Sequence, residues 1–279
     1  MDLPFKFIQN KITKKWVISA ATRSRRPKTA KGVEPTCPFC PGRENLVPGE
    51  VYRLDMDRDK KDDNWEVRVV PNKFPFAPVH ELIVHSPNHN LVLGEMSIHQ
   101  IEKLVWVYRH RISAHQGEGT VLLFNNTGVE AGASLPHPHT QLVVIPPKVK
   151  LQVDPLGEIE NVVYESKHFQ VFVPSYSTMP YEVWVVPKLN REKGRGFWEA
   201  GDKELFDFAG IMQKLTRSTL KKFGRTSPFN FYFYPGGNWY FRLIPRERII
   251  GGFEFSTGVF VNSTPIEEVI KFYQKELRT

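Results

Sequence analysis

The chain has 279 residues, of which 41% are hydrophobic and 24% are charged, a composition typical of a soluble globular protein with room for one or two domains. No apolar run approaches the ~18 residues that a membrane span needs, and the start of the chain has no signal-peptide core, so we expect a cytoplasmic protein without a membrane partner. The net charge of +8 favours anionic partners. Because no nucleic-acid-binding motif accompanies this charge, a phosphorylated small molecule fits better than nucleic acid.

A loop that contains both cysteines follows the first predicted strand. Residues 14–19 predict this strand, and residues 31–48 form a loop rich in proline and glycine that carries Cys37 and Cys40. In a cytosolic chain the C-x-x-C spacing indicates a metal or redox site rather than a structural disulfide. Two thiolates supply only half of the four ligands that a structural zinc ion needs, so the spacing alone leaves the kind of site open.

Strands and one helix are predicted next. Residues 65–70 and 81–85 read as strands, and Ser97 with Gln100 predicts a capping box at the start of a helix over 97–116. A strand at 120–124 leads into a polar, glycine-rich loop that extends to Ser134. Such a loop lets backbone amides approach a phosphate.

The following strand places two histidines and a glutamine on one face. His137, His139 and Gln141 are each two residues apart, and side chains alternate between the faces of a strand. Pro138 belongs at a strand entry, and the apolar run 142–145 anchors the strand in a core. A lone histidine is usually a core or surface residue, but this group after a glycine-rich loop predicts a functional site.

The second half repeats the order of elements. Strands are predicted at 168–174, 180–187, 229–234 and 239–245, with a helix after Asp202. A glycine-punctuated segment at 249–262 follows, and then a helix with Thr264 as its N-cap and Pro265 as its first residue. This order predicts an internal duplication, with one half over 1–150 and the other over 151–279.

Matching the Ile-Pro pair that ends the last predicted strand of each half aligns the two copies. Asn238 then falls on His139, and Tyr240 falls on Gln141. Because the second copy lacks the histidine pair, the chemistry is expected in the first half.

An ordered series of motifs resembles the galactose-1-phosphate uridylyltransferase family, the transferase branch of the histidine triad superfamily. The series comprises Ala21–Pro27, Cys37–Cys40, Val70–Pro75, Ser86–His89, Phe124–Gly128, His137–Gln141 and Gly252–Glu254. Each motif alone is weak, but their order is specific. The resemblance implies an α+β fold in which a histidine-triad-like unit is duplicated, giving two antiparallel-sheet halves that each pack a helix.

The resemblance also implies a metal site and a nucleophile. Cys37, Cys40, His89 and His137 would form a closed tetrahedral shell around a structural zinc ion. His139 would attack the α-phosphorus of a nucleotide sugar and carry the nucleotide as a covalent intermediate. The implied substrate contacts are Arg23 and Arg26 with phosphates, Asn72 and Asn126 with the nucleoside, Gln141, Ser134 and amides near Gly132 with phosphate oxygens, and Phe253 and Glu254 with the hexose.

The implied activity moves UMP between UDP-hexose and hexose 1-phosphate, as in the conversion of UDP-glucose and galactose 1-phosphate to glucose 1-phosphate and UDP-galactose. The resemblance also implies that the protein is a homodimer. Gln141 stands where hydrolases of the superfamily have a third histidine, and an amide cannot relay protons, which favours transfer over hydrolysis. Two alternatives remain open: an ADP-glucose or dinucleotide phosphorylase on the same scaffold, and a non-catalytic nucleotide- or nucleic-acid-binding protein. Some family members hold a second metal where this chain has Tyr234, Tyr240 and Arg242, so that second site is expected to be absent.

Overall fold

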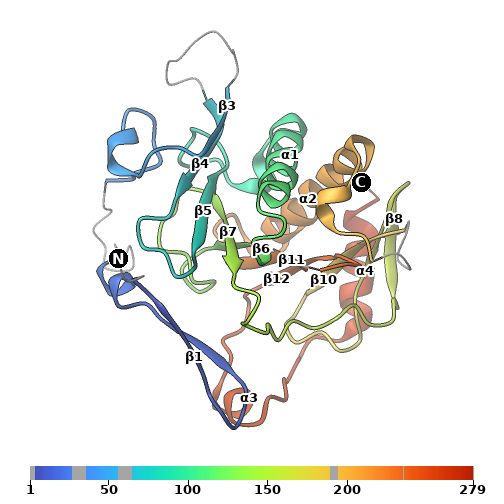
Figure 1. The fold of residues 1–279 in the computed structure, drawn as a ribbon. Coiled ribbons are helices and arrows are strands. Elements are labelled where there is room, and N and C mark those ends of the chain that lie inside the picture. Colours follow the sequence, from blue (N-terminus) through green and yellow to red (C-terminus); the bar gives the residue numbers. More distant parts are fainter. Residues whose placement is uncertain (1–3, 27–35, 56–64, 189–193, 235, 279) are drawn as a thin grey trace.

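A computed structural model describes residues 4–26, 36–55, 65–188, 194–234 and 236–278 of the chain (Figure 1). Pro27 and the first residues of the predicted cysteine loop, 31–35, lie outside the described residues. The strands are β1 (Lys6–Gln9), β2 (Trp16–Ser19), β3 (Tyr52–Asp55), β4 (Trp65–Pro71), β5 (Val79–Val84), β6 (Thr120–Thr127), β7 (His139–Ile145), β8 (Val162–Glu165), β9 (Phe169–Phe172), β10 (Val183–Pro187), β11 (Phe229–Phe233) and β12 (Phe241–Pro245). The α-helices are α1 (Ile98–Ala114), α2 (Asp202–Phe223), α3 (Gly252–Thr257) and α4 (Ile266–Glu276).

One 10-stranded antiparallel sheet organises the molecule, in the order β3-β4-β5-β7-β6-β11-β12-β10-β9-β8. The order reads the same from both edges, because β3, β4, β5, β7 and β6 correspond in turn to β8, β9, β10, β12 and β11. The two sets join where β6 pairs with β11. The predicted α+β class with antiparallel sheet is therefore confirmed, and the two sets of strands share a single continuous sheet.

Two edge strands, β3 and β8, were not predicted from the sequence. Each has only four residues, and each pairs with its neighbour through a register shift. The alternation of apolar and polar residues that marks a strand is weak in such short, irregular edge segments. Both strands occupy the same place in their half of the sheet.

Helices α1 and α2 lie side by side over one face of the sheet (Figure 1). Buried apolar residues of both helices form one core with that face of the sheet. Ser97 caps α1 as predicted, since its Oγ accepts a hydrogen bond from the Gln100 N–H at 3.2 Å. The other half of the expected capping box is wrong: the Gln100 side chain donates instead to the carbonyls of Glu66 and His85, at 2.9 and 2.6 Å.

The C-terminal segment differs from its prediction in two places. Helix α4 begins at Ile266 with Pro265 as its N-cap, one residue later than expected, because Pro265 has an extended backbone with a ψ of 132°. The glycine-punctuated segment contains the short helix α3. This helix and the β1–β2 hairpin lie at the lower end of the molecule in Figure 1. Within the described ranges, each helix is too short or too polar to cross a membrane.

Candidate active site

The histidine strand, β7, lies between β5 and β6 in the first half of the sheet. All of its residues are buried. Leu142 and Val144 belong to the core beneath the helices. Because side chains alternate along a strand, His139 and Gln141 project from the opposite face of the sheet, away from α1.

Two hydrogen bonds from neighbouring segments fix the backbone at the start of β7. The buried Asn125 donates from Nδ2 to the carbonyl of His139 at 2.7 Å. The backbone N–H of His85 donates to the carbonyl of Pro138 at 3.1 Å. The proline cannot join the strand ladder through a nitrogen of its own, so these contacts hold the strand entry in place.

The His139 ring is oriented by its own backbone. Its Nδ1 lies 2.8 Å from the carbonyl oxygen of His137, so Nδ1 carries the hydrogen and donates it. Nε2 therefore keeps a lone pair for a ligand. Burial lowers the pKa of His139, which favours the neutral ring.

His139 and Gln141 line a cavity of about 260 Å³ on this face of the sheet. The other lining residues come from the basic segment, the cysteine loop, the turn after β4, β5 and the end of the glycine-rich loop: Arg25, Arg26, Thr36, Pro38, Phe39, Leu46, Val47, Pro48, Pro71, Asn72, Lys73, Phe74, Leu82, Ser134 and Leu135. Segments that are more than 100 residues apart in the sequence thus share one cavity, with cationic, hydroxyl, amide and imidazole groups in its wall.

His80 connects two of the predicted site residues. Its Nε2 lies 3.0 Å from Oε1 of Gln141 and 3.0 Å from Nδ2 of Asn72. Asn72 is itself fixed, because its Oδ1 accepts from the N–H of Phe74 at 2.9 Å. His80 is only 4% exposed, and burial lowers its pKa to about 4, so the ring is neutral at physiological pH.

The two predicted arginines have different surroundings. Arg26 lines the cavity and donates from Nη2 to the hydroxyl of Ser134, which ties the basic segment to the glycine-rich loop. Arg23 donates to the carbonyl of Phe74 at 2.8 Å and stacks over the Phe76 ring at 4.7 Å. Burial, and secondarily the charge of Arg26, lower the pKa of Arg23 to about 10. Arg23 therefore supports the wall of the cavity, and Arg26 faces it.

The glycine-rich loop is held by internal bonds and by the second half of the chain. The N–H groups of Gly132 and Ala133 donate within the loop, at 2.9 and 3.0 Å, so these two of the amides near Gly132 already have partners. Gly132 also provides a φ of +85° that the turn requires. Asn126 accepts from Asn230 of β11 at 2.8 Å. It lies beside a small cavity of about 40 Å³ between the loop and the histidines.

The four predicted metal ligands lie together. One ligand atom from each of Cys37, Cys40, His89 and His137 falls within 4.8 Å of all the others. Nδ1 of His137 is 3.6 Å from Cys37 Sγ and 3.8 Å from Cys40 Sγ, and Nδ1 of His89 is 3.3 Å from Cys40 Sγ. A tetrahedral zinc ion with ordinary bond lengths separates sulfur and nitrogen ligands by about 3.6 Å, so the donor set fits a metal ion.

Electrostatics and neighbouring contacts also suit a cation at this cluster. Burial raises the pKa of the Cys37 thiol to about 11 and lowers that of His137 to about 4, so these two side chains are neutral when no cation is bound. A bound divalent cation reverses this preference for the thiols, because it stabilises thiolates. Nε2 of His137 lies 2.8 Å from the carbonyl of Ser86, a contact that directs Nδ1 to the cluster.

Phe253 and Glu254 are not brought to this cavity within one chain. Both lie in α3, and neither lines the cavity. Glu254 is 6% exposed and caps its own helix by accepting from the N–H of Gly251 at 3.0 Å, with Arg248 as an ion partner. Glu254 is therefore neither exposed nor part of a strand. Phe253 is 54% exposed.

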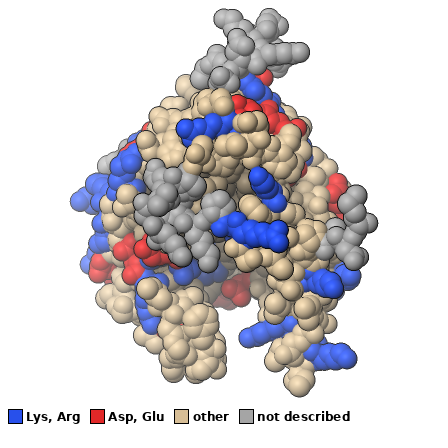
Figure 2. Space-filling view, turned by 90° about the vertical axis from the view of Figure 1, so that its left-hand side faces the viewer, with Lys and Arg blue, Asp and Glu red and all other residues tan. Residues whose placement is uncertain are grey.

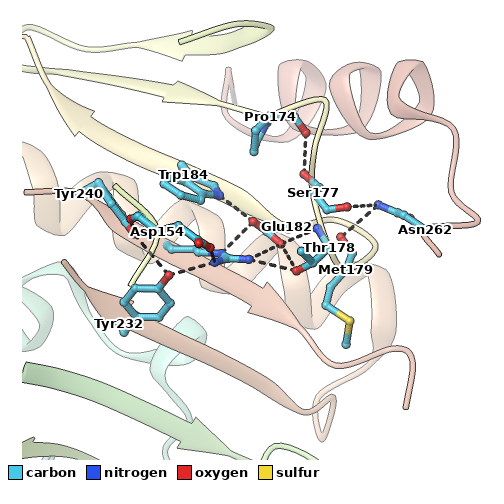
Figure 3. Close-up of polar contacts among 11 residues, drawn as sticks. Asp154, Pro174, Ser177, Thr178, Met179, Glu182, Trp184, Tyr232, Tyr240 and Asn262 are labelled. Carbon is cyan, nitrogen blue, oxygen red and sulfur yellow. Dashed lines mark hydrogen bonds and ion pairs between the residues drawn. The ribbon is translucent and has the colours of Figure 1, made fainter. Parts of the chain in front are cut away.

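The second half fills the corresponding face of the sheet with a buried ion pair (Figure 3). Arg242 donates to Glu182 at 2.9 Å and to the hydroxyl of Tyr232 at 3.0 Å. Trp184 donates to the same carboxylate at 2.7 Å, and Tyr240, which the Ile-Pro match aligns with Gln141, donates to the carbonyl of Asp154 at 2.6 Å. On this face of the second half, the Arg242 guanidinium, the Glu182 carboxylate and the aromatic side chains contact one another. The first half has an open cavity on the same face.

Several polar residues near the site were not predicted from the sequence, among them His80, His85 and Asn125. His80 is the second residue of β5, on the face shared with Leu82 and Gln141, and a period of two along β5 is the one signal that could have found it. His85 lies behind the site, where Nε2 meets the hydroxyls of Thr140 and Tyr108 at 2.7 and 3.2 Å.

Comparisons with known proteins agree with this geometry. Residues 58–144 match the model of the galactose-1-phosphate uridyl transferase N-terminal domain. The chain is 26% identical to an ADP-glucose phosphorylase of Arabidopsis thaliana, over 93% of this chain and 90% of that protein. It is 31% identical to a galactose-1-phosphate uridylyltransferase of Thermotoga maritima, over 81% of this chain and 79% of that protein.

A solved structure shares the fold. The crystal structure of an ADP-glucose phosphorylase from Arabidopsis thaliana with bound ADP-glucose superposes with a TM-score of 0.73 at 24% identity, covering 97% of this chain and 99% of that one. Both kinds of relative are enzymes that act as nucleotidyltransferases or phosphorylases. The motif order, the fold and the 31% identity over four-fifths of the chain together establish that this protein belongs to the galactose-1-phosphate uridylyltransferase family of the histidine triad superfamily.

Proposed function

We propose that the protein transfers a nucleotidyl group from a nucleotide sugar to a second phosphate compound through a covalent intermediate on Nε2 of His139. One observation carries the proposal: the 2.8 Å contact of Nδ1 with the carbonyl of His137 leaves the Nε2 lone pair as the nucleophile. Burial supports the neutral form of the ring, which is the form that attacks. The adjoining cavity gives the substrate a place beside this nitrogen.

The reaction has two half-reactions. First, Nε2 bonds to the α-phosphorus of the donor, the bond from that phosphorus to the bridging oxygen breaks, and the sugar 1-phosphate leaves. An oxygen of the incoming phosphate then attacks the same phosphorus, the N–P bond breaks, and the neutral imidazole returns. Gln141, Ser134 and Arg26 would donate to the non-bridging oxygens as their charge changes. Because the Gln141 amide cannot pass a proton from water, the intermediate survives until a phosphate acceptor arrives.

We assign UDP-glucose as the donor and galactose 1-phosphate as the acceptor, so that UMP moves between hexose phosphates. The identity of 31% to the Thermotoga maritima uridylyltransferase supports this choice. Phosphorolysis of ADP-glucose is the second candidate, because the similarity to the Arabidopsis thaliana phosphorylase extends over 93% of the chain. In either case Asn72 and Asn126 are the proposed contacts for the nucleoside.

Mass spectrometry of the intact protein tests the proposal. The protein is incubated with UDP-glucose, ADP-glucose or diadenosine tetraphosphate, and then with galactose 1-phosphate or inorganic phosphate. A UMP adduct that galactose 1-phosphate removes supports the first assignment, and an AMP adduct that inorganic phosphate removes supports the second. His139→Gly should abolish the adduct without changing the fold. Failure of every donor to form an adduct would contradict the mechanism.

We also propose that the metal is zinc, held by Cys37, Cys40, His89 and His137. Two thiolates and two imidazoles are a common structural zinc set, and a closed shell gives the ion a structural role. It would tie the cysteine loop to the strand entry that precedes His139. Elemental analysis should find one zinc per chain, and a Cys40→Ser variant should lose it, whereas zinc-free wild-type protein with full stability would contradict the assignment.

A homodimer formed through the C-terminal arm is the third part of the proposal. The arm, residues 249–261, exposes six large apolar side chains: Ile249 (80%), Phe253 (54%), Phe255 (80%), Val259 (57%), Phe260 (42%) and Val261 (49%). The lower end of the molecule, where α3 and the β1–β2 hairpin lie, divides into two projections in Figure 2, and Lys and Arg side chains gather on one of them. Water-exposed apolar surface of this extent marks an interaction site.

A second copy would cover the arm and would offer Phe253 and Glu254 to the cavity of its partner, where they could meet the hexose. Phe255→Glu should then convert the dimer to a monomer in light scattering. Phe206→Glu is the matched control, because Phe206 is 62% exposed on α2, away from the arm. The arm proposal fails if wild-type protein is monomeric at micromolar concentration, or if both variants have the same effect.

We also propose that the half over 1–150 carries the chemistry and that the half over 151–279 supports it.

A further inference from the structure

The wall of the cavity contains a histidine that the proposed reaction does not use. His80 is 4% exposed and lies between two side-chain amides, with Nε2 at 3.0 Å from Gln141 Oε1 and at 3.0 Å from Asn72 Nδ2. One nitrogen of a neutral imidazole either donates or accepts, so it cannot satisfy a carbonyl oxygen and an amide N–H₂ group at the same time. The tautomer of His80 therefore decides which of the two contacts is a hydrogen bond.

The backbone beside the ring selects the tautomer. The N–H of Phe76 donates to Nδ1 of His80 at 3.4 Å, so Nδ1 is the acceptor and the hydrogen resides on Nε2. The edge of the ring also meets Phe76, with ring centroids 4.4 Å apart, which restricts rotation of the imidazole. Burial first, and the nearby charges of Arg23 and Arg26 second, disfavour the imidazolium, so a second hydrogen is not added.

This tautomer fixes the orientation of the Gln141 amide. With hydrogen on Nε2, His80 donates to Oε1 of Gln141, and the amide nitrogen of Gln141 is turned away from His80. Within the part of the chain that the structure describes, this nitrogen has no hydrogen-bond partner, and Gln141 lines the cavity. In the opposite tautomer, Nε2 would accept from Gln141, and Oε1 would replace the N–H₂ group on the cavity side. An oxygen there would repel a phosphate oxygen.

We propose that His80 is a positioning residue that holds the Gln141 amide with its N–H₂ group toward the phosphate of the substrate. This inference rests on the proposed nucleotidyl transfer and adds to it the residue that sets the direction of a phosphate-binding donor. His80 itself touches neither the phosphorus nor His139 in this role, because it acts through Gln141.

A double-mutant cycle tests the coupling. The rate of adduct formation on His139 is measured by rapid quench and intact-mass spectrometry in wild type, His80→Leu, Gln141→Leu and the double variant. We expect each single variant to be slower by about tenfold, with the donor KM changed less than the rate, because the lost donor acts on charge in the transition state. We expect the double variant to be no slower than Gln141→Leu, because His80 has nothing left to orient. Losses that multiply, or a His80→Leu variant with the wild-type rate, overturn the proposal.

Two variants separate positioning from a structural role. In His80→Gln, the amide nitrogen can reach the place of imidazole Nε2 and donate, so most of the rate should return although the ring is gone. His99→Gln is the matched control, because the side chain of His99 is 80% exposed on α1, and it should keep the wild-type rate. A His80→Gln variant as slow as His80→Leu, with both as stable as wild type in urea, would show that donation to Gln141 is not the function of this ring.

A measurement without turnover decides the proposal even if no nucleotide sugar reacts. ¹⁵N NMR of protein labelled in its histidine rings distinguishes a protonated Nε2 from a protonated Nδ1, and the His80→Leu spectrum assigns the signals. We expect hydrogen on Nε2 of His80 at pH 7.5 and a shift of the Gln141 side-chain N–H₂ signal in His80→Leu. Hydrogen on Nδ1 contradicts the inference, whereas failure of all donors to form an adduct contradicts the proposed function alone.

Discussion

Asn230 offers a direct test of how the second half of the chain supports the site. It sits opposite Asn126 where β11 pairs with β6, at the junction of the two halves. Its Nδ2 group donates to Asn126 Oδ1 at 2.8 Å, to the carbonyl of Ala131 at 2.9 Å and to that of Asn125 at 3.2 Å. Two amide hydrogens thus serve three acceptors, and they hold the glycine-rich loop against the sheet.

We expect Asn230→Ala to lower the free energy of unfolding by about 2 kcal/mol, since each of two hydrogen bonds contributes about 1 kcal/mol net. Asn230→Asp has nearly the same shape but replaces the donor with an oxygen that faces three acceptor oxygens. It should therefore cost more than the alanine variant, by about 1–3 kcal/mol, because it adds a part-buried oxygen that has no donor and that repels the three acceptors. The KM for the nucleotide sugar should rise in both, because the loop that carries Ser134 loosens.

Equilibrium urea unfolding followed by circular dichroism measures these differences. Asn90→Ala is the control, because the Asn90 side chain is exposed, and it should change stability by less than about 0.5 kcal/mol. The reasoning is refuted if Asn230→Asp is as stable as Asn230→Ala or more stable. That result would mean that the amide hydrogens do not hold the loop.

Three further predictions concern the backbone, acid stability and the metal. Gly128→Ala should lower the free energy of unfolding by about 2 kcal/mol or more relative to Gly42→Ala. Both glycines have a positive φ, but of the two only Gly128 would bring its Cβ against another residue, at 2.8 Å from Pro228 Cβ. Equal urea midpoints for the two variants would contradict the steric argument. Burial holds the native pKa of His80 at about 4, so between pH 4 and 6.5 the unfolded chain binds more protons than the native state. The free energy of unfolding should therefore fall as the pH falls through this window. Urea titrations at pH 5 and 7.5 should show a smaller fall for His80→Gln than for wild type. Chelation at pH 7.5 should lower the thermal midpoint of wild-type protein but not that of Cys37→Ser, which has already lost a ligand; an unchanged wild-type midpoint would count against a structural ion.

Local sequence patterns predicted the elements around the site because the information lies in neighbouring residues. Ser97 before a run of helical periodicity located the start of α1. The apolar run 142–145, preceded by Pro138, located β7 and its entry. The short edge strands β3 and β8 were missed, because pairing with a neighbour, rather than their own pattern, makes them strands.

The sequence by itself determined the chemical groups of this protein: a histidine strand, a pair of cysteines, a glycine-rich loop and their family order. Only the tertiary structure decided which of these groups meet. It placed His80 against Gln141, used the amides of Gly132 and Ala133 inside the loop, and left Phe253 outside the cavity. The physical reason is that these contacts depend on strand register and on which strands are neighbours in the sheet, and both are set by packing of the whole chain.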